Sequence, residues 1–409
     1  MLARAAAWAC VASVTFAPSA FAQPASSTDP AVDALLQSRL ANPRLGTDIG
    51  LVVIDAATGT LVSEHNADAL MLPASNMKIV TAVDALHTMD PASAFHTRVR
   101  AGATPDEIVL QGGGDPLLVR ADLEDLAVQA ATSLTPGSRI GLRVDRSLFP
   151  ETGKGPGWTN EYLPWVATPI VPLARLGYYG PDPIGDATRV FAAKLRALGF
   201  HVKVGTPLDS AATGNVIADT SRHSVADAVG VMLSHSENNV AEVLYRQVAV
   251  ATGRSADWQG AREAAEATLA DLGIDASGMR LLDGSGLSRK DRVSPAFLAQ
   301  VLRLARVTQQ DQFSAMFTLQ ALPVAGKTGT LATAYGRYVT AHSRCARGDV
   351  HAKTGSLFDT ISLSGIADTV GGDERIFSIL VNHRPQRYSA LSERQVLDGL
   401  TATITGCWH

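Results

Sequence analysis

Three short motifs in this chain could carry nucleophilic acyl-transfer chemistry. Ser75 stands three residues before Lys78, Ser236 stands two residues before Asn238, and residues 353–355 read Lys-Thr-Gly. Among the seven lysines only Lys78 has a serine at that spacing, and only Asn238 among the asparagines follows a serine by two positions. Each motif alone is weak, but all three in this order are hard to reach by accident.

The first motif pairs a nucleophile with a base. A serine hydroxyl attacks efficiently only when a neighbouring base takes its proton, and lysine can do so only when it is neutral. The pKa of Lys78 must therefore fall from about 10.4, and burial together with a second cation such as Lys353 would lower it. Pro73 predicts a helix start close to Ser75, which would place Ser75 and Lys78 on one helix face. The ordered motifs resemble the active-site signature of penicillin-interacting serine acyltransferases.

This resemblance implies a role for the remaining motif residues. Ser236 would relay a proton to the leaving amine, and Asn238 would bind a substrate amide. Lys353 and Thr354, with Gly355 completing the motif on an edge strand, would hold the terminal carboxylate of the substrate. The backbone N–H groups of Ser75 and Ser356 would form an oxyanion hole, and the helix N-terminus at Ser75 would favour the developing charge.

The chain contains a second Lys-Thr-Gly at residues 327–329. We assign the motif to Lys353 because residues 350–352 lead into it as a strand and residues 360–363 follow as a hairpin partner. The first copy stands after Leu322-Pro323-Val324-Ala325-Gly326 and continues like a Gly-rich loop.

The elements around the motifs predict a mixed α/β domain built from both ends of the chain. Strands are expected at 49–55 and 60–64, and at 350–357, 360–367 and 375–381, the last followed by a helix at 389–405. Such an order is typical of one antiparallel sheet with helices on its faces. Helices at 224–233 and 239–251 would place Ser236 in the connection between them.

The middle of the chain differs in texture. Residues 95–220 contain short strand-like runs and turns rich in Gly and Pro, and we interpret them as an inserted, mostly β subdomain. The expected organisation is therefore a signal peptide at 1–22, a catalytic domain from 23–94 and 221–409, and the insertion at 95–220.

Further segments make the resemblance specific. The chain is similar to the D-alanyl-D-alanine carboxypeptidase/endopeptidase family of class C low-molecular-mass penicillin-binding proteins, peptidase family S13. The shared segments run from about residue 30 to about residue 400 and include 112–116 (GGGDP), 236–242 (SENNVAE), 283–289 (DGSGLSR), 322–326 (LPVAG) and 329–331 (GTL). Two features depart from the family: Glu237 stands where Asp is usual, and the stretch between Ser75 and Ser236 is shorter, so that one inserted domain is expected to be missing.

The resemblance implies fold and function together. It implies an antiparallel sheet of the β-lactamase/DD-peptidase type, and a serine enzyme that hydrolyses D-alanyl-D-alanine bonds of peptidoglycan stem peptides as a carboxypeptidase, an endopeptidase or both. β-Lactams would be its covalent inhibitors. We expect no cofactor and no metal.

Composition and the N-terminus predict an exported globular protein. The 409 residues are 46% hydrophobic and 18% charged, enough to bury a sizeable core. Arg4, the apolar run 5–16 and the small residues Ala20 and Ala22 predict a signal peptide cut after Ala22, and hence a periplasmic or extracellular cell-wall location. Its removal lowers the net charge of −4 by one, a balance that favours neither nucleic acid nor an anionic membrane surface.

Two cysteines remain after such a cleavage. Cys345 and Cys407 form an even pair in an oxidising compartment, so that a disulfide is expected, with two buried free thiols as the alternative. No apolar stretch after residue 22 is long enough to span a bilayer.

Other functions were weighed against this interpretation. Residues 321–328 approach a phosphate-binding loop, but the strand before it and the helix after it are poor. No serine has glycine at both −2 and +2, and H-E-x-x-H is absent. Two alternatives stay open: a serine β-lactamase, although its E-x-x-L-N loop is not found, and a catalytically silent penicillin-binding scaffold. Ser75 as a plain helix cap is the bland alternative, and Asp283 and Ser285 are interpreted as part of a turn that shapes the fold.

Overall fold

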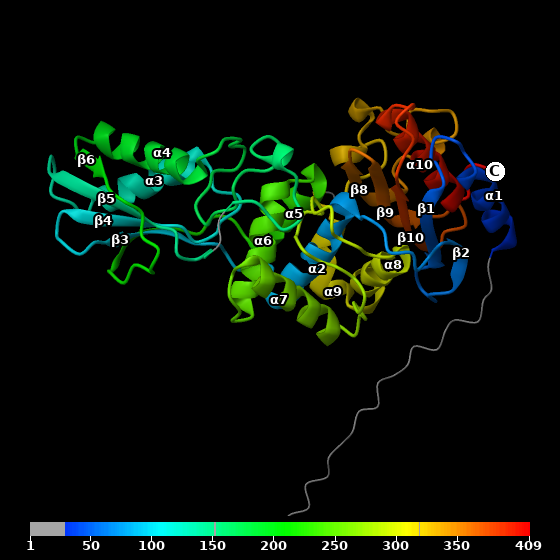
Figure 1. Cartoon of the computed structure of the whole chain (residues 1–409), viewed down its shortest axis with the longest axis horizontal. Coiled ribbons are helices and arrows are strands. Elements are labelled where there is room, and N and C mark those ends of the chain that lie inside the picture. The colour runs from blue at the N-terminus through cyan, green and yellow to red at the C-terminus, as the bar shows by residue number, and fades with distance from the viewer. Residues whose placement is uncertain (1–28, 151–152, 319) are drawn as a thin grey trace, which may run out of the picture.

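The computed structural model describes residues 29–150, 153–318 and 320–409. The expected signal peptide at 1–22 lies outside these residues. Three parts follow one another along the longest axis of the molecule: a five-stranded sheet with the C-terminal helix, a group of helices in the middle, and a second sheet at the far end (Figure 1).

The first sheet joins the two ends of the chain. Its strands are β1 (Asp48–Asp55), β2 (Leu61–His65), β8 (Val350–Leu357), β9 (Thr360–Asp368) and β10 (Glu374–Asn382). They lie in the order β2-β1-β10-β9-β8, and every neighbouring pair is antiparallel. Strand β1 pairs directly with β10, Ile49 opposite Val381. The predicted antiparallel sheet from distant segments is confirmed.

Both faces of this sheet are buried. On β10, Phe377 and Ile379 pack with α1 (Pro30–Leu40) and α10 (Ala390–Ile404), whereas Ile376 and Leu380 belong to the core formed with the middle helices. Successive side chains of a strand point to opposite faces, so a strand that is covered twice has an uninterrupted apolar sequence. Strand β8, at one edge of the sheet, lies against the turn Ala74–Asn76 that leads into the middle helices.

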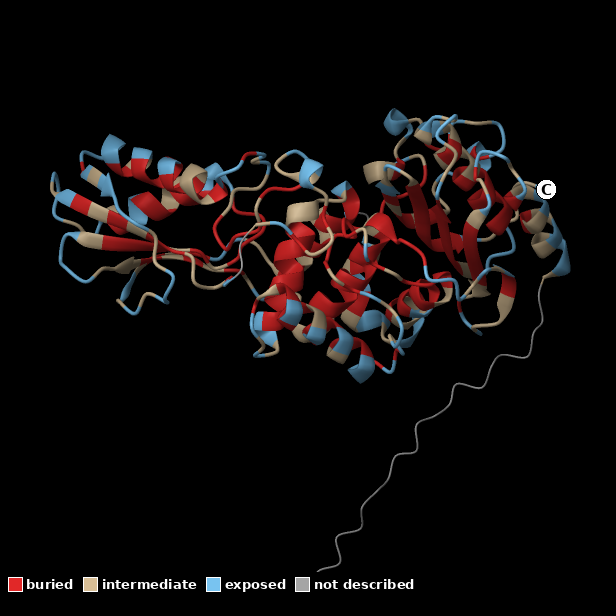
Figure 2. Cartoon of the chain, viewed as in Figure 1, coloured by how far each residue is buried: buried red, intermediate tan, exposed pale blue. Residues whose placement is uncertain are grey.

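The middle group surrounds a central helix, α2 (Met77–Thr88). Around it lie α5 (Val225–His235), α6 (Asn238–Ala251), α7 (Trp258–Asp271), α8 (Pro295–Arg303) and α9 (Gln310–Phe313). All residues of α2 from Met77 to Leu86 are buried, and the surrounding helices are buried on the sides that face it (Figure 2). A helix covered on every side belongs to the core, so Lys78 in its first turn is removed from water. No helix in the described part of the chain is both long and apolar enough to cross a membrane.

The second sheet belongs to the segment that interrupts these elements. It contains β3 (Thr97–Ala101), β4 (Glu107–Gln111), β5 (Arg139–Asp145), β6 (His201–Val204) and β7 (Val216–Thr220), in the order β6-β5-β4-β3-β7. The pairs β4/β5 and β5/β6 are parallel, so the sheet is mixed. We keep 95–220 as the proposed bounds of this subdomain.

The expectation of a mostly β insertion must be corrected. The segment also contains α3 (Arg120–Ala131) and α4 (Pro183–Ala197), which pack against each other and belong to the core of the second sheet. On α3 the buried residues Leu123, Leu126, Ala127 and Ala130 recur at helical spacing. The Gly- and Pro-rich turns around the helices drew attention to the short strands and away from this periodicity.

A disulfide ties the C-terminus to the body of the first sheet. Cys345 and Cys407, 62 residues apart, are bonded, with their Cα atoms 5.9 Å apart. Cys345 lies in the 3₁₀ turn Arg344–Ala346 and Cys407 follows α10. In the chain-entropy account a loop of this length is worth about 4 kcal/mol of stability.

Candidate active site

The amine of Lys78 joins the first two motifs. Its Nζ lies 3.1 Å from Ser75 Oγ and 2.8 Å from Asn238 Oδ1. A third neighbour is the backbone carbonyl of Ser285, at 2.8 Å. A neutral amine has two N–H bonds and one lone pair; if it donates to Asn238 and Ser285, the lone pair is left for the Ser75 hydroxyl. The geometry is therefore that of a base beside a nucleophile.

Burial is the main cause that prepares Lys78 to act as a base. It lowers the pKa of Lys78 to about 8, against the opposing charges of Glu242, Asp283 and Glu237, which raise it. The pKa of Lys353 is also lowered well below its usual value, by burial first and by the charge of Lys78 second. Burial is confirmed as the cause that lowers the pKa of Lys78, whereas the expected second cation is not: the neighbouring charges that act on Lys78 are carboxylates, which raise its pKa.

The backbone before Ser75 is strained. Ser75 lies in a 3₁₀ turn, Ala74–Asn76, that leads directly into α2. Ala74 has a φ of +48°, a conformation that a residue with a Cβ rarely adopts. Strain of this kind persists only where the surroundings enforce it, and it gathers at functional sites. Ser236, in the second motif, is also left-handed, with a φ of +59°.

Strand β8 approaches Ser75 through its backbone. A Cβ on Gly355 would lie 3.0 Å from the backbone nitrogen of Ser75 and 2.0 Å from Ser362 Oγ, so only glycine fits. Ser362 in turn donates to the carbonyl of Pro73, at 2.8 Å. An oxyanion hole shared by the N–H groups of Ser75 and Ser356 needs such a close passage of strand and turn.

Asn76 fastens the first motif to the same sheet. Its amide is fully buried and lies 2.6 Å from Ser364 Oγ on β9. With the amide nitrogen turned toward β8, Asn76 donates to the carbonyl of Lys353 at 2.9 Å and its oxygen accepts from Ser364. The sequence analysis did not single out Asn76.

The two Lys-Thr-Gly copies lie in different surroundings. Lys353 is fully buried and donates to the carbonyl of Thr354, at 2.8 Å. Lys327 is exposed and its amine lies beside Gly348. The loop of the first copy nevertheless reaches the second, because Thr330 Oγ1 lies 2.8 Å from Thr354 Oγ1.

The second motif forms the tight turn between α5 and α6. Ser236 is the left-handed residue that ends α5, and Asn238 begins α6. Asn238 accepts from Lys78 and donates through Nδ2 to the carbonyl of Val166, at 2.8 Å. Beside the expected contact with substrate, Asn238 therefore has a second task, which is to hold the amine of Lys78. Glu237, the departure from the family pattern, accepts a hydrogen bond from Tyr179 at 3.1 Å.

Several residues that the sequence analysis left out of the site contact Lys78 or hold the turn that does so. The turn at 283–288 supplies the Ser285 carbonyl, and its backbone N–H groups are held by two fully buried carboxylates, Glu242 and Asp283. A backbone carbonyl has no signature in a sequence. Glu242 did have one, because it is an acid in the middle of the apolar residues Val240, Ala241, Val243 and Leu244.

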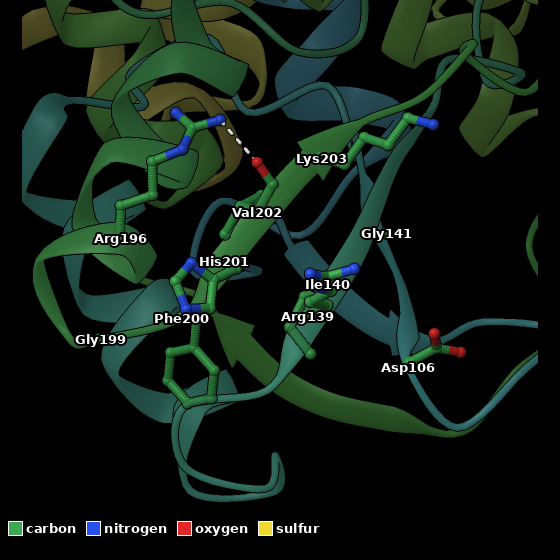
Figure 3. A pocket seen from close by; sticks show the side chains of 10 residues that line it. All are labelled: Asp106, Arg139, Ile140, Gly141, Arg196, Gly199, Phe200, His201, Val202 and Lys203. Carbon is green, nitrogen blue, oxygen red and sulfur yellow. Dashed lines mark hydrogen bonds between the residues drawn. The ribbon is translucent and has the colours of Figure 1, made fainter.

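A separate cavity lies at the other end of the molecule. It has a volume of about 790 Å³ and lies against β6, at the edge of the second sheet. Arg139, Arg196, His201 and Lys203 line it together with Asp106, and Arg196 donates to the carbonyl of Val202 (Figure 3). None of the three motifs contributes to it.

Comparisons with known proteins agree with one another. The sequence matches the D-Ala-D-Ala carboxypeptidase 3 (S13) family over residues 32–174 and 176–404. It is 32% identical over 397 residues to carboxypeptidase DacB of Mycolicibacterium smegmatis, covering 91% of this chain and 83% of that protein. The fold is similar to penicillin binding protein 4 (dacB) from Haemophilus influenzae, with a TM-score of 0.80 and 20% identity over 91% of this chain and 98% of that one. The penicillin G acylated Bd3459 endopeptidase of Bdellovibrio bacteriovorus matches with a TM-score of 0.56 and 18% identity, over 88% and 91% of the two chains.

Proposed function

The chain belongs to the D-Ala-D-Ala carboxypeptidase 3 (S13) family, and we propose that it hydrolyses the D-alanyl-D-alanine bond of peptidoglycan stem peptides through an acyl-enzyme on Ser75. The family expected from the motifs is confirmed, and the protein is a serine DD-peptidase. The observation that carries the proposed mechanism is the contact of 3.1 Å between Lys78 Nζ and Ser75 Oγ inside a desolvated site.

Acylation follows from this contact. Lys78 takes the proton of Ser75 while Oγ attacks the carbonyl carbon of the penultimate D-alanine. The negative charge that forms on the carbonyl oxygen is held by the N–H groups of Ser75 and Ser356. When the C–N bond breaks, Ser236 passes its hydroxyl proton to the leaving amine and takes the proton of Lys78 in its place, so that D-alanine departs and Lys78 is neutral again. Water then attacks the ester with Lys78 as base and releases the shortened peptide.

Substrate binding depends on the edge strand. A stem peptide laid along β8 would place its terminal carboxylate at Lys353 and Thr354 and its amide at Asn238. A carboxylate beside Lys353 favours the charged amine and raises its pKa again, so that substrate binding is coupled to proton uptake. β-Lactams, which carry a carboxylate and an acyl group at similar separation, would acylate Ser75 in the same way.

The rate of acylation should rise with pH through about 8. Only neutral Lys78 can accept the proton, and the pKa of Lys78 is about 8. Below that pH the neutral fraction of Lys78 falls about tenfold per unit, so the rate at pH 6 should be about one hundredth of its plateau. Stopped-flow acylation by a fluorescent penicillin from pH 5 to 10 measures this directly. A rate that stays flat between pH 6 and 9 would contradict Lys78 as the base.

Replacing Lys353 with alanine should weaken substrate binding, whereas the same change at Lys327 should not. Charge-assisted hydrogen bonds to a buried carboxylate account for roughly a 10- to 100-fold increase in KM in K353A. K327A is the matched control, because Lys327 is in the other Lys-Thr-Gly copy and is exposed. Steady-state kinetics with a pentapeptide decide between the copies, and a larger loss in K327A would reverse the assignment.

The activity itself is tested with defined muropeptides. A monomeric pentapeptide and a cross-linked dimer are incubated with the protein, and the products are identified by mass. Loss of one D-alanine from the monomer indicates carboxypeptidase activity, and cleavage of the dimer indicates endopeptidase activity. A β-lactamase would instead turn over penicillin rapidly and leave both peptides intact. A silent scaffold would become acylated and cleave neither.

Peptidoglycan lies outside the cytoplasmic membrane, so the proposed activity requires export. The disulfide between Cys345 and Cys407 supports an oxidising compartment, periplasmic or extracellular.

A further inference from the structure

We propose that Glu242 is a positioning residue for Lys78: through the backbone of Ser285 it fixes the carbonyl that orients the amine toward Ser75. The inference rests on the proposed function and adds a group that does not touch the substrate. Glu242 lies on α6, one turn after Asn238, and its side chain is fully buried.

The connection runs through a single peptide segment. Glu242 Oε1 accepts from the N–H of Ser285 at 2.8 Å, and Oε2 accepts from the N–H of Gly284 at 3.1 Å. The carbonyl of Ser285 accepts from Lys78 Nζ at 2.8 Å. Ser285 therefore donates its N–H to the carboxylate of Glu242 and accepts through its carbonyl from the amine of Lys78. A shift of the turn would move the third contact of Lys78 by the same amount.

The other contacts of the turn do not involve the N–H of Ser285, which is bound by Glu242. Asp283 accepts from the N–H of Gly286 and of Ser288, and so shapes the far side of the turn. Thr81 on α2 donates to the carbonyl of Gly284, at 2.7 Å. Gly286, with a φ of +80°, lies against the carbonyl of Ala74, where a Cβ would be only 1.8 Å away. The turn therefore contacts α2, α6 and Ala74, the strained residue before Ser75.

Charge gives Glu242 a second effect on the same amine. Its carboxylate raises the pKa of Lys78 and opposes the effect of burial. Burial and the neighbouring Asp283 raise the pKa of Glu242 to about 8, although its hydrogen bonds from the turn lower it. The ionisable groups that face this pair from α2, α6, β8 and the turns are Asp84, Glu237, Tyr245, Asp283, Asp291 and Lys353.

The test is the pH profile of acylation in Glu242→Gln. Glutamine keeps the shape, loses the charge, and cannot accept from both N–H groups, because one end of its amide is a donor. With the carboxylate removed, the pKa of Lys78 falls further wherever Glu242 would have been ionised, so the acid limb of the profile should move to lower pH. The misplaced carbonyl should lower the plateau rate about tenfold. The readout is acylation by a fluorescent penicillin, followed from pH 5 to 10.

Two further variants separate the effects. Asp398→Asn removes another fully buried carboxylate, on α10, which pairs with Arg337. This variant should change neither the pH of the acid limb nor the plateau rate of acylation. Thr81→Val loosens the turn without changing its charge, and should lower the plateau roughly two- to tenfold with the acid limb unmoved. An acid limb of E242Q at the wild-type position, or an equal shift in D398N, overturns the inference.

The remaining outcomes are also decisive. If E242Q shows no cooperative thermal transition, the plateau of T81V decides, and an unchanged plateau overturns the positioning role. If the wild type is acylated but releases no D-alanine from a pentapeptide, the proposed function fails while the profiles still test Glu242. If Ser75 is not acylated at all, both fail.

Discussion

Replacing Ser75 with alanine should abolish D-alanine release and covalent labelling by penicillin together. The variant retains Lys78 and the oxyanion donors, but it has no oxygen to form the ester. We expect the rate of D-alanine release to fall by at least about 10⁴-fold and the penicillin adduct to disappear. Product analysis with a pentapeptide and intact-mass measurement after penicillin treatment check the two results.

A matched variant excludes the bland interpretation of Ser75 as a helix cap. Ser389 is such a cap at α10, where its hydroxyl accepts from the N–H of Ser392. S389A should lose about 1 kcal/mol of stability and keep its activity. If S75A retained activity within tenfold of the wild type and lost only stability, Ser75 would be a structural residue like Ser389.

Replacing Lys78 with methionine should lower acylation roughly 10³-fold, the usual contribution of a positioned general base. Methionine approximates the length of the lysine stem in the buried helix. It leaves the acceptors on Asn238 and Ser285 without a donor, so a lower melting temperature is also expected. Stopped-flow acylation near the pH optimum gives the rate, and a thermal melt shows how much folded protein contributes.

An exposed lysine provides the comparison for that variant. Lys203 lies on β6 in the second sheet, far from the motifs, and K203M should acylate at the wild-type rate. A rate for K78M within about tenfold of K203M would require another base, and the pH profile of the wild type would then need a different assignment.

Local spacing explains why part of the site could be predicted. Ser75 and Lys78 are in contact because residues three apart share a face at a helix start, and this spacing can be read directly from the sequence. The strands of the first sheet could also be predicted, since they are apolar runs of ordinary length that lie toward both ends of the chain. The preference for Lys353 over Lys327 came from the same strand context, and in the structure Lys353 is buried while Lys327 is exposed.

Contacts between residues far apart in the sequence explain why the rest could not be predicted. Asn238 reaches Lys78 across 160 residues and Ser285 does so across 207, the latter through a carbonyl that any residue carries. The interpretation of Asp283 and Ser285 as part of a turn that shapes the fold missed that the turn also supplies a hydrogen-bond acceptor to the amine of Lys78. The second cation expected to lower the pKa of Lys78 is not among the causes of its shift: burial lowers the pKa, and the charges of Glu242, Asp283 and Glu237 raise it.

The most direct test of the central claim is to locate the penicillin adduct. The wild-type protein is treated with penicillin, digested, and mapped by mass spectrometry, while a parallel sample is assayed for D-alanine release from a pentapeptide. The account predicts one adduct with the full mass of penicillin on the peptide that contains Ser75, and D-alanine release that this adduct blocks. An adduct on a different residue, or D-alanine release that continues after Ser75 is fully acylated, would contradict it.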